Sequence, residues 1–431
     1  MNPYTIALSL MLLVSALTDL VRRFSFGSIT ALGVLTIVAG VGSFVLVVLR
    51  AKIPKAALSA TFLVLFLVLG VFSLYLNSAS AVISLVGGMQ NLLTYGAFVG
   101  LLILSAIETS RSPYLPWYVS DGFTRIAQIS GTIYGVSLLI DGFGTSLLMG
   151  ARSFALFAII AVAWCLAMWR YRSPGAAVWA LLLSVLVAAS FSRTAMIATL
   201  VLYPLSRFSP HKAEGWLKMM LWVGMMALIA YLAFTFVEPI RERFTDTGDS
   251  GQLGGLRVNT SGRETIWEAV QSSIDDSPLI GKGPGSVAVP VNAVNKTANG
   301  HPHNDYLRLM HDYGYIGLGL WLCGYGSLLV ATLRNWLWAD RNDRSTAHIH
   351  LAALLALVGV ALAMLTDNLV IYIFAIGSVG SASGGFDRGG SLRRKNVGET
   401  TSRSLLSGSR RMVRRSHFIG GMVAGWGQVV R

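Results

Sequence analysis

The sequence predicts an all-α polytopic membrane protein with about 12 transmembrane helices and one large, partly helical extracytoplasmic loop. Of the 431 residues, 54% are apolar and 13% charged, with a mean hydropathy of +0.62, which is too apolar for a soluble domain of this size. Apolar runs of roughly 20 residues, the length that crosses a bilayer, recur along the chain. Ten of the twenty acidic residues lie between Glu238 and Asp312, so one polar segment stands out.

Short connections separate the predicted spans. Each is expected to be helical, because a spanning segment must satisfy its own backbone hydrogen bonds in lipid. The first run is interpreted as a span rather than a removed signal peptide, since it lacks a preceding basic region and a clear cleavage site. The candidate spans are Tyr4–Leu20, Gly27–Leu49, Ala56–Leu76, Ala81–Ile107, Phe123–Ile140, Ser153–Trp169, Gly175–Ser190, Phe191–Leu205, Leu217–Val237, Gly314–Trp336, Ile349–Leu365 and Asn368–Val379.

Lysine and arginine in the short loops predict the orientation. Arg22 and Arg23 fall on the outer side, whereas the other loops place their basic residues on one side, taken as cytoplasmic: Arg50, Lys52, Lys55, Arg170, Arg172, Arg207, Lys212, Arg334, Arg341 and Arg344. The resulting domains are spans one to nine in 1–237, an extracytoplasmic catalytic loop in 238–313, spans ten to twelve in 314–380 and a basic cytoplasmic tail in 381–431.

The net charge of +14 does not indicate a nucleic-acid-binding protein. The tail alone holds ten basic residues against two acids, and the positive-inside bias accounts for the remainder. We expect the tail to be disordered and attracted to anionic lipid. Cys165 and Cys323 each lie inside an apolar span, so neither a disulfide framework nor a cysteine metal site is predicted.

A helix is predicted near the middle of the polar segment. Ser261 and Glu264 fit a capping box, and the following residues to Ile274 are compatible with a helix. Arg263 would then lie in the first turn, where the helix dipole disfavours a cation. Either an anion docks there, since free amides and a guanidinium together bind phosphate, or Arg263 pairs with Glu264 or Glu268.

The glycine-rich stretch 281–286 does not match a phosphate-binding loop. No strand precedes it, and the Gly-Lys-Ser/Thr order is absent. A tight turn after Pro278 is expected instead. Asp275 and Asp276 are adjacent at a helix end and point apart, so a solvated turn is predicted rather than a catalytic pair.

Histidines precede the next predicted helix, with Asn304 as its N-cap and Gly314 as its stop. The dipole of that helix would keep His303 neutral near pH 7, as a general base requires. A surface histidine is one alternative, and a metal site with His301 and His311 is another. No Glu or Cys stands at a recognised ligand spacing, so no metal or other cofactor is predicted.

Arg193 lies between two apolar helices, near the outer surface by the span count. Ionisable groups at membrane depth line a wet cavity or meet an anion, although an arginine can also snorkel to the interface. Asp367, also near the outer face, is a candidate to pair with an arginine or to orient a ligand.

These motifs, in this order, resemble the O-antigen ligase and O-antigen polymerase superfamily. The resemblance covers roughly residues 176–367, and the combined spacing is more specific than any single motif. The matching residues are Ser192-Arg193, Ser261-Gly262-Arg263-Glu264-Thr265-Ile266-Trp267, Pro278-Leu279-Ile280-Gly281-Lys282-Gly283, His303-Asn304-Asp305-Tyr306-Leu307 and Tyr313-Gly314-Tyr315-Ile316-Gly317.

The resemblance implies a metal-independent membrane glycosyltransferase that moves a glycan from undecaprenyl diphosphate to an acceptor sugar, for O-antigen or exopolysaccharide. By motif, Arg193 and Arg263 would hold the diphosphate and His303 would take the acceptor proton. His301 is an addition to the pattern that leaves the choice of base open. We also expect His301, Asn304 and Tyr306 to contact substrate.

The expected partners are the lipid-linked donor, an acceptor on growing polysaccharide or lipid A core, membrane lipid and other polysaccharide export proteins, with no nucleic acid. The expected location is the bacterial inner membrane, with the site on the periplasmic side. The motifs do not separate a polymerase from a ligase.

Two other classes are weighed against this interpretation. A transporter or flippase of lipid-linked oligosaccharides would place polar groups midway through several spans, whereas here they gather in one outer loop. A non-catalytic scaffold would tolerate replacement of His303 and Arg263.

Overall fold

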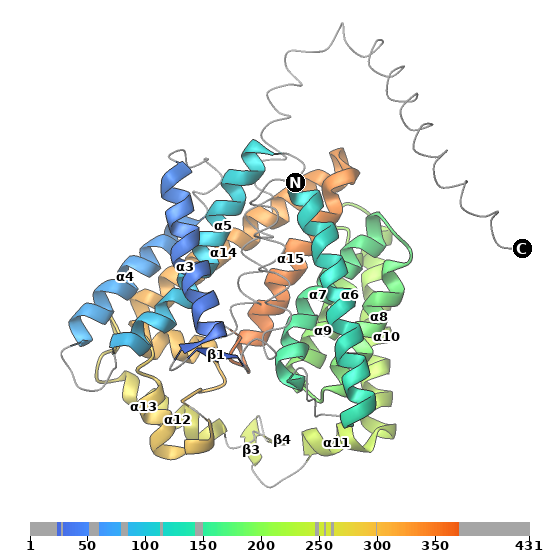
Figure 1. Ribbon diagram of the computed structural model, residues 1–431. Helices are drawn as coiled ribbons and strands as arrows, with labels where there is room; N and C mark the ends of the chain where they lie inside the picture. The colour runs from blue at the N-terminus through green and yellow to red at the C-terminus, as the bar shows by residue number, and fades with distance from the viewer. Residues whose placement is uncertain are drawn as a thin grey trace, which may run out of the picture. The chain divides into compact units, whose positions relative to one another are not determined.

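The computed structural model describes residues 24–26, 29–50, 60–78, 85–112, 115–142, 150–245, 250–253, 256–259, 263–298 and 300–369. The described fold is helical, with two short antiparallel ribbons (Figure 1). The ribbons pair β1 (Ser25–Phe26) with β2 (Ile29–Thr30) and β3 (Ser250–Leu253) with β4 (Leu256–Asn259). The predicted span Tyr4–Leu20, the tail 381–431 and the cap residue Ser261 lie outside the described residues.

The helices follow the order of the predicted spans. Each span expected between Gly27 and Leu365 coincides with a helix, and further helices occur between residues 238 and 313. The helices are α3 (Ala31–Arg50), α4 (Thr61–Asn77), α5 (Leu85–Arg111), α6 (Leu115–Asp141), α7 (Ala151–Tyr171), α8 (Ala176–Ala189), α9 (Arg193–Arg207), α10 (Ala213–Phe236), α11 (Glu238–Thr245), α12 (Arg263–Ile274), α13 (Ala288–Val294), the 3-10 turn η2 (Lys296–Ala298), α14 (Asp305–Asn342) and α15 (Arg344–Met364).

Five of these helices are long and apolar enough to cross a membrane: α5, α7, α10, α14 and α15. The helices α8 and α9 are shorter, with 14 and 15 residues. In the last predicted span, Asn368 and Leu369 are described and are not helical, and its remaining residues are outside the described ranges. The multi-pass character is therefore supported, while the figure of about 12 spans stays a prediction.

The centre of the helical part is α7. Its residues from Phe154 to Ala167 are at most 1% exposed, because α8, α9 and α15 pack around it. A helix that is apolar on every face is stable only when it is surrounded in this way. By contrast, α10 contacts mainly α9 and buries only Gly215 and Met226, so most of its apolar surface faces outward.

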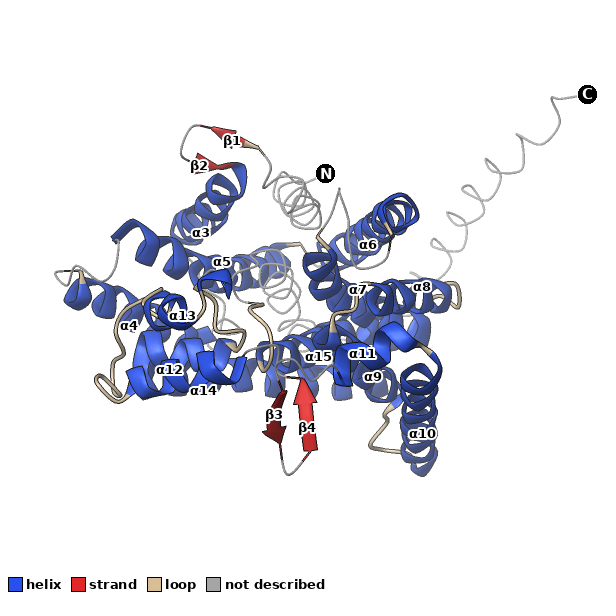
Figure 2. Ribbon diagram, turned by 90° about the horizontal axis from the view of Figure 1, so that it is seen from below, coloured by secondary structure: helices blue, strands red, loops and turns tan. Residues whose placement is uncertain are grey.

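The segment between α11 and α14 has its own small core. Ile266 and Val270 of α12 pack against Val291 of α13 and Leu307 of α14. Figure 2 shows α12 and α13 beside α14. The helix expected up to Ile274 is confirmed, and it places Arg263 at its first residue.

Gly314 breaks α14 as expected, but the helix resumes on the other side of the break. Its φ of 68° and ψ of −174° are accessible to glycine and costly for other residues. At this break the carbonyls of His311 and Asp312 accept from the amides of Lys282 and Gly283, at 3.0 Å each.

The residues just before this glycine-rich stretch accept hydrogen bonds from α14 in return. The amides of Tyr315 and Ile316 donate to the carbonyls of Pro278 and Leu279, at 2.7 and 3.1 Å. These four hydrogen bonds pair backbone groups that the break leaves without a partner inside the helix. Gly281 also has a positive φ of 71°, so the expected turn after Pro278 is confirmed, and its role is structural.

Candidate active site

His303 lies in the connection that leads into α14. Asn304 caps the helix, since its Oδ1 accepts from the amide of Leu307 at 3.0 Å, and this confirms the predicted N-cap. His303 has a φ of 55°, in the left-handed region that costs a residue with a side chain of order 1–3 kcal/mol. In the described part of the chain only one other non-glycine residue, Phe191, has a positive φ, and it lies two positions before Arg193.

Thr366–Asn368, the segment that follows α15, contacts several of the candidate site residues. Arg263 donates to the carbonyl of Thr366 at 2.6 Å, and the Thr366 hydroxyl lies 2.7 Å from that of Thr194. Thr194 directly follows Arg193 at the start of α9. The segment therefore contacts Arg263 directly and contacts the neighbour of Arg193, and Arg193 is close enough to affect the charge of Arg263. Arg263 forms no ion pair with Glu264 among the described residues.

A third arginine, Arg152, joins them. Its Nε lies 2.9 Å from Asp367 Oδ1 and its Nη2 lies 2.5 Å from the same oxygen. The Asp367 side chain is only 3% exposed, so this is an ion pair in a partly dry environment. The expectation that Asp367 pairs with an arginine is confirmed.

The sequence analysis missed Arg152. Its signal was a basic residue at the outer end of the span predicted from Ser153, where the positive-inside bias does not place one. Arg152 is the first-turn residue of the otherwise buried helix α7, and this position brings it to His303.

His303 is held by two neighbours. Its ring atom Nδ1 lies 2.7 Å from Arg152 Nη2 and 2.7 Å from Asn368 Nδ2. Its backbone amide donates to Asn368 Oδ1 at 2.8 Å. The imidazole thus has one defined position at the edge of the arginine cluster.

The cluster formed by Arg152, Arg193 and Arg263 carries excess positive charge. Burial, together with Arg152 and Arg193 and against the opposing effect of Asp367, lowers the pKa of Arg263 to about 10. Asp367 is the carboxylate that the described residues place against this cluster, through its ion pair with Arg152. Such a site favours an anion, because bound negative charge relieves the repulsion.

The imidazole of His303 is neutral near pH 7. Burial lowers its pKa to about 3, with further contributions from Arg152, Arg263, His301 and Arg308. The neutral state was expected, but its main physical cause differs from the expected one. Burial and nearby cations act on the ring, rather than the helix dipole alone.

The other predicted contact residues are placed as follows. His301 Nδ1 lies 2.7 Å from Nη2 of Arg308, a residue that is 3% exposed. The hydroxyl of Tyr306 donates to the carbonyl of Ala361 in α15 at 3.1 Å. Their contacts with substrate stay predictions.

His311 belongs to a separate network at the α14 break. Its ring nitrogens lie 3.1 Å from the hydroxyls of Ser273 and Ser286, and Ser286 donates to Asp312 at 3.0 Å. Within the described residues no group of three His, Cys, Asp or Glu is arranged to hold a metal ion. Asp276 is exposed and pairs with Lys282 at 2.6 Å, which confirms the solvated turn expected there.

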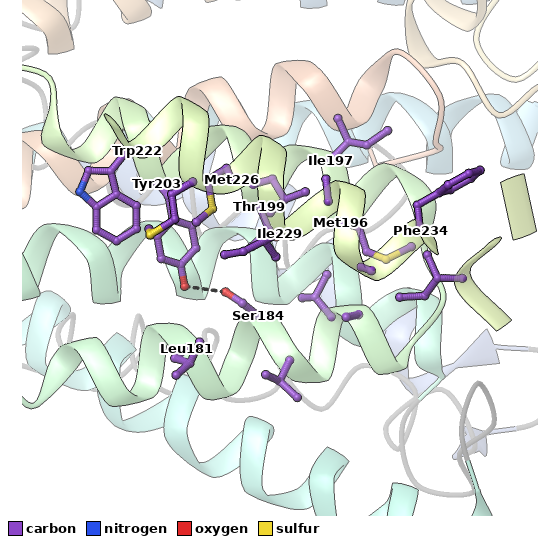
Figure 3. A pocket seen from close by; sticks show the side chains of 18 of the residues that line it. Leu181, Ser184, Met196, Ile197, Thr199, Tyr203, Trp222, Met226, Ile229 and Phe234 are labelled. Atoms are coloured by element: carbon purple, nitrogen blue, oxygen red, sulfur yellow. Dashed lines mark hydrogen bonds between the residues drawn. The ribbon is translucent and has the colours of Figure 1, made fainter. Parts of the chain in front are cut away.

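An apolar cavity of about 790 Å³ lies between α8, α9, α10 and α11 (Figure 3). Its lining is almost entirely apolar, and the hydroxyls of Ser184 and Tyr203 satisfy each other at 2.9 Å. One end is lined by Phe244, whose ring centre lies 6.0 Å from the guanidinium of Arg193. The cavity therefore reaches the arginine cluster.

Comparison with known families finds a match over one part of the chain. Residues 178–322 match the family model of the O-antigen ligase. The matched segment includes Arg193, Arg263 and His303, and the match is consistent with the O-antigen ligase and polymerase superfamily that the motifs resemble. Comparison with curated proteins finds no match. Arg152, on α7, and Asp367, in the segment after α15, lie outside the matched residues in sequence and pair with each other beside His303.

Proposed function

We propose that this protein is a membrane glycosyltransferase that moves a glycan from undecaprenyl diphosphate to an acceptor sugar in surface polysaccharide synthesis. The observation that carries this proposal is the convergence of three arginines and a neutral histidine on Thr366–Asn368. His303 is the general base, and Arg193 and Arg263 bind the diphosphate. The site faces the outer side of the bacterial inner membrane.

Charge balance supports a diphosphate donor. The three guanidinium groups lie beside the Asp367 carboxylate, and a diphosphate esterified at both ends carries two negative charges that such a cluster attracts. In the transition state a third negative charge develops on the leaving diphosphate. Fixed guanidinium groups that face this charge stabilise the transition state more than the ground state.

The proposed chemistry is one displacement at the anomeric carbon. The acceptor hydroxyl gives its proton to His303 as its oxygen attacks that carbon, and the bond to the diphosphate oxygen breaks. The electron pair stays on the departing undecaprenyl diphosphate. The donor also tunes the base, because anionic charge beside the arginines opposes their effect and raises the pKa of His303 from its low value.

The apolar cavity suits the lipid part of such a donor. Many of its apolar lining residues are exposed on the surface of the helices, and one lining residue, Phe244, lies beside Arg193. A prenyl chain in the cavity would place its diphosphate at the arginines. Because the chain enters the cavity from lipid rather than from water, the cavity would position the chain rather than supply hydrophobic free energy.

Product length in liposomes tests this function. Purified protein is given undecaprenyl-diphosphate-linked repeat units, with or without a lipid A core acceptor, beside the variants His303→Ala and His211→Ala. His211 is exposed and contacts Arg341, so it serves as a matched control. A ladder that requires His303 identifies a polymerase, and transfer only to the core identifies a ligase. No transfer to either acceptor would refute the proposed function.

A further inference from the structure

The side chain of Asn368 fixes the protonation of the His303 ring. Its Oδ1 accepts from the His303 backbone amide at 2.8 Å, which settles the orientation of the amide group. Its Nδ2 is therefore the atom that lies 2.7 Å from His303 Nδ1. An amide nitrogen only donates, so Nδ1 accepts.

Arg152 places a second donor on the same atom. A guanidinium has no acceptor, and its Nη2 lies 2.7 Å from His303 Nδ1. The neutral ring consequently carries its proton on Nε2. In this state one ring nitrogen holds a proton and the lone pair of the other is engaged, so neither accepts the proton of an acceptor hydroxyl.

The contacts of Arg152 allow it to release the ring without leaving the site. Its Nε and Nη2 both bind Asp367, whose side chain is 3% exposed, while the Arg152 side chain is 38% exposed. Asp367 thus holds the guanidinium through both Nε and Nη2. The outer Nη2 is shared between Asp367 and His303, and it lies in the cluster that attracts an anion.

We propose that Arg152 is a positioning residue that makes the base available only when the donor is bound. The diphosphate draws Arg152 Nη2 away from His303 Nδ1, and Asp367 retains the guanidinium through Nε. The Nδ1 lone pair is then engaged by the neutral Asn368 amide alone, and this weaker hydrogen bond breaks as Nδ1 takes the acceptor proton. The inference rests on the proposed function and deepens it.

The proton and electrons balance in this scheme. The O–H bond of the acceptor breaks and an N–H bond forms at Nδ1, which gives an imidazolium that keeps its Nε2 proton. The acceptor oxygen forms a bond to the anomeric carbon, and the carbon–oxygen bond to the diphosphate breaks. The imidazolium then loses a proton to water or to the diphosphate, and Arg152 returns to Nδ1.

Nitrogen NMR of ¹⁵N-histidine-labelled protein in nanodiscs tests the inference directly. The His303→Gln variant assigns the signals of His303. We expect the Nε2–H tautomer with a hydrogen-bonded Nδ1 in the unliganded protein, and a shift of the Nδ1 signal when undecaprenyl diphosphate is added. An Nδ1–H tautomer without ligand, or an unchanged Nδ1 signal with ligand bound, overturns the inference.

A pH profile separates positioning from a purely structural role. The charged groups that face His303 are Arg152 on α7, Arg263 on α12, His301 before α14, Arg308 on α14 and Asp367 after α15. Arg152→Gln removes the cation nearest Nδ1, so the acid limb of kcat/KM moves to higher pH. A structural role would lower the rate without moving that limb, and an unmoved limb counts against the inference.

Two further variants keep the test decisive. Arg152→Lys retains the cation and an ion pair with Asp367, so its acid limb stays closer to that of the wild type even if Arg152→Gln folds poorly. Arg344→Gln changes an exposed arginine outside the site and leaves the profile unchanged. Failure of undecaprenyl diphosphate to bind the wild type would refute the proposed function, whereas binding without a change at Nδ1 refutes only the role of Arg152.

Discussion

Arg263 donates a hydrogen bond of 2.6 Å to the backbone carbonyl of Thr366, 103 positions further along the chain. This bond joins the first residue of α12 to the segment that follows α15. Because Asp367 and Asn368 come next in the chain, the same segment also positions Arg152 and His303. One short connection therefore aligns groups from helices that are distant in sequence.

Replacing His303 by Gln should lower glycosyl transfer by about 10²–10⁴-fold, the usual contribution of a general base. Binding of undecaprenyl diphosphate should persist, since the three arginines remain. Initial rates and donor binding in nanodiscs measure both effects, with His211→Gln as the matched control. A His303→Gln rate within a factor of about two of the wild type would exclude His303 as the base.

Replacing Arg193 or Arg263 by Lys should reduce transfer severely, because an ammonium lacks the two-pronged geometry of a guanidinium. Each lost charged hydrogen bond costs about 1.5–3 kcal/mol, which corresponds to roughly a 10- to 150-fold loss in kcat/KM for the donor. The control is Arg344→Lys at an exposed position. Near-normal kinetics in both site variants would contradict the diphosphate role.

Leu181 and the adjacent Leu182 are both exposed, but Leu181 lines the apolar cavity and Leu182 does not. Leu181→Trp should displace part of a prenyl chain. The displaced chain would hold its diphosphate less well against the arginines, so the KM for the undecaprenyl donor should rise several-fold. Leu182→Trp should have no such effect. Kinetics with a donor that carries a much shorter prenyl chain provide the comparison, and an equal change for both donors would argue against this location of the chain.

Gly314→Ala should lower the thermal stability by several degrees. An added Cβ would overlap the carbonyl oxygen of Leu279, and the left-handed conformation alone costs about 1–2 kcal/mol. Gly319 lies in the same helix with no neighbour within 4 Å of an added Cβ, so Gly319→Ala is the control. Thermal unfolding in detergent distinguishes the two, and equal midpoints would mean that the break at Gly314 is not required.

The pKa of about 3 for His303 also predicts a pH-dependent stability. The pKa is lower in the folded state than in the unfolded state, so the unfolded chain binds more protons below pH 6.5. The stabilising contribution is present above pH 6.5 and is lost as the pH falls toward 3. The Tm advantage of wild type over His303→Gln should therefore shrink on acidification, and a constant difference would contradict the lowered pKa.

Local patterns were sufficient for several elements. The apolar runs predicted the helices because burial in lipid requires internal hydrogen bonding. Asn304 was recognised as an N-cap, and the glycine turn after Pro278 was recognised from its residue types. These features depend on neighbours within a few positions, so the sequence contains the necessary information.

Contacts between residues that are far apart in the sequence could not be predicted from local patterns. The role of Gly314 in α14 depends on the turn around Leu279, whose backbone groups form hydrogen bonds in place of those that the helix loses at the break. The importance of Arg152 depends on Asp367 and His303, which are 215 and 151 positions away. Nothing in the local sequence of α7 specifies these partners.

The sequence by itself determined that this is a multi-pass helical protein with the motifs of an O-antigen ligase domain, including Arg193, Arg263 and His303. The tertiary structure alone decided that a third arginine completes the cluster and that the His303 ring carries its proton on Nε2. The reason is physical. Hydropathy and capping act between neighbours in the chain, whereas charge pairing and ring protonation depend on atoms that only folding brings within hydrogen-bonding distance.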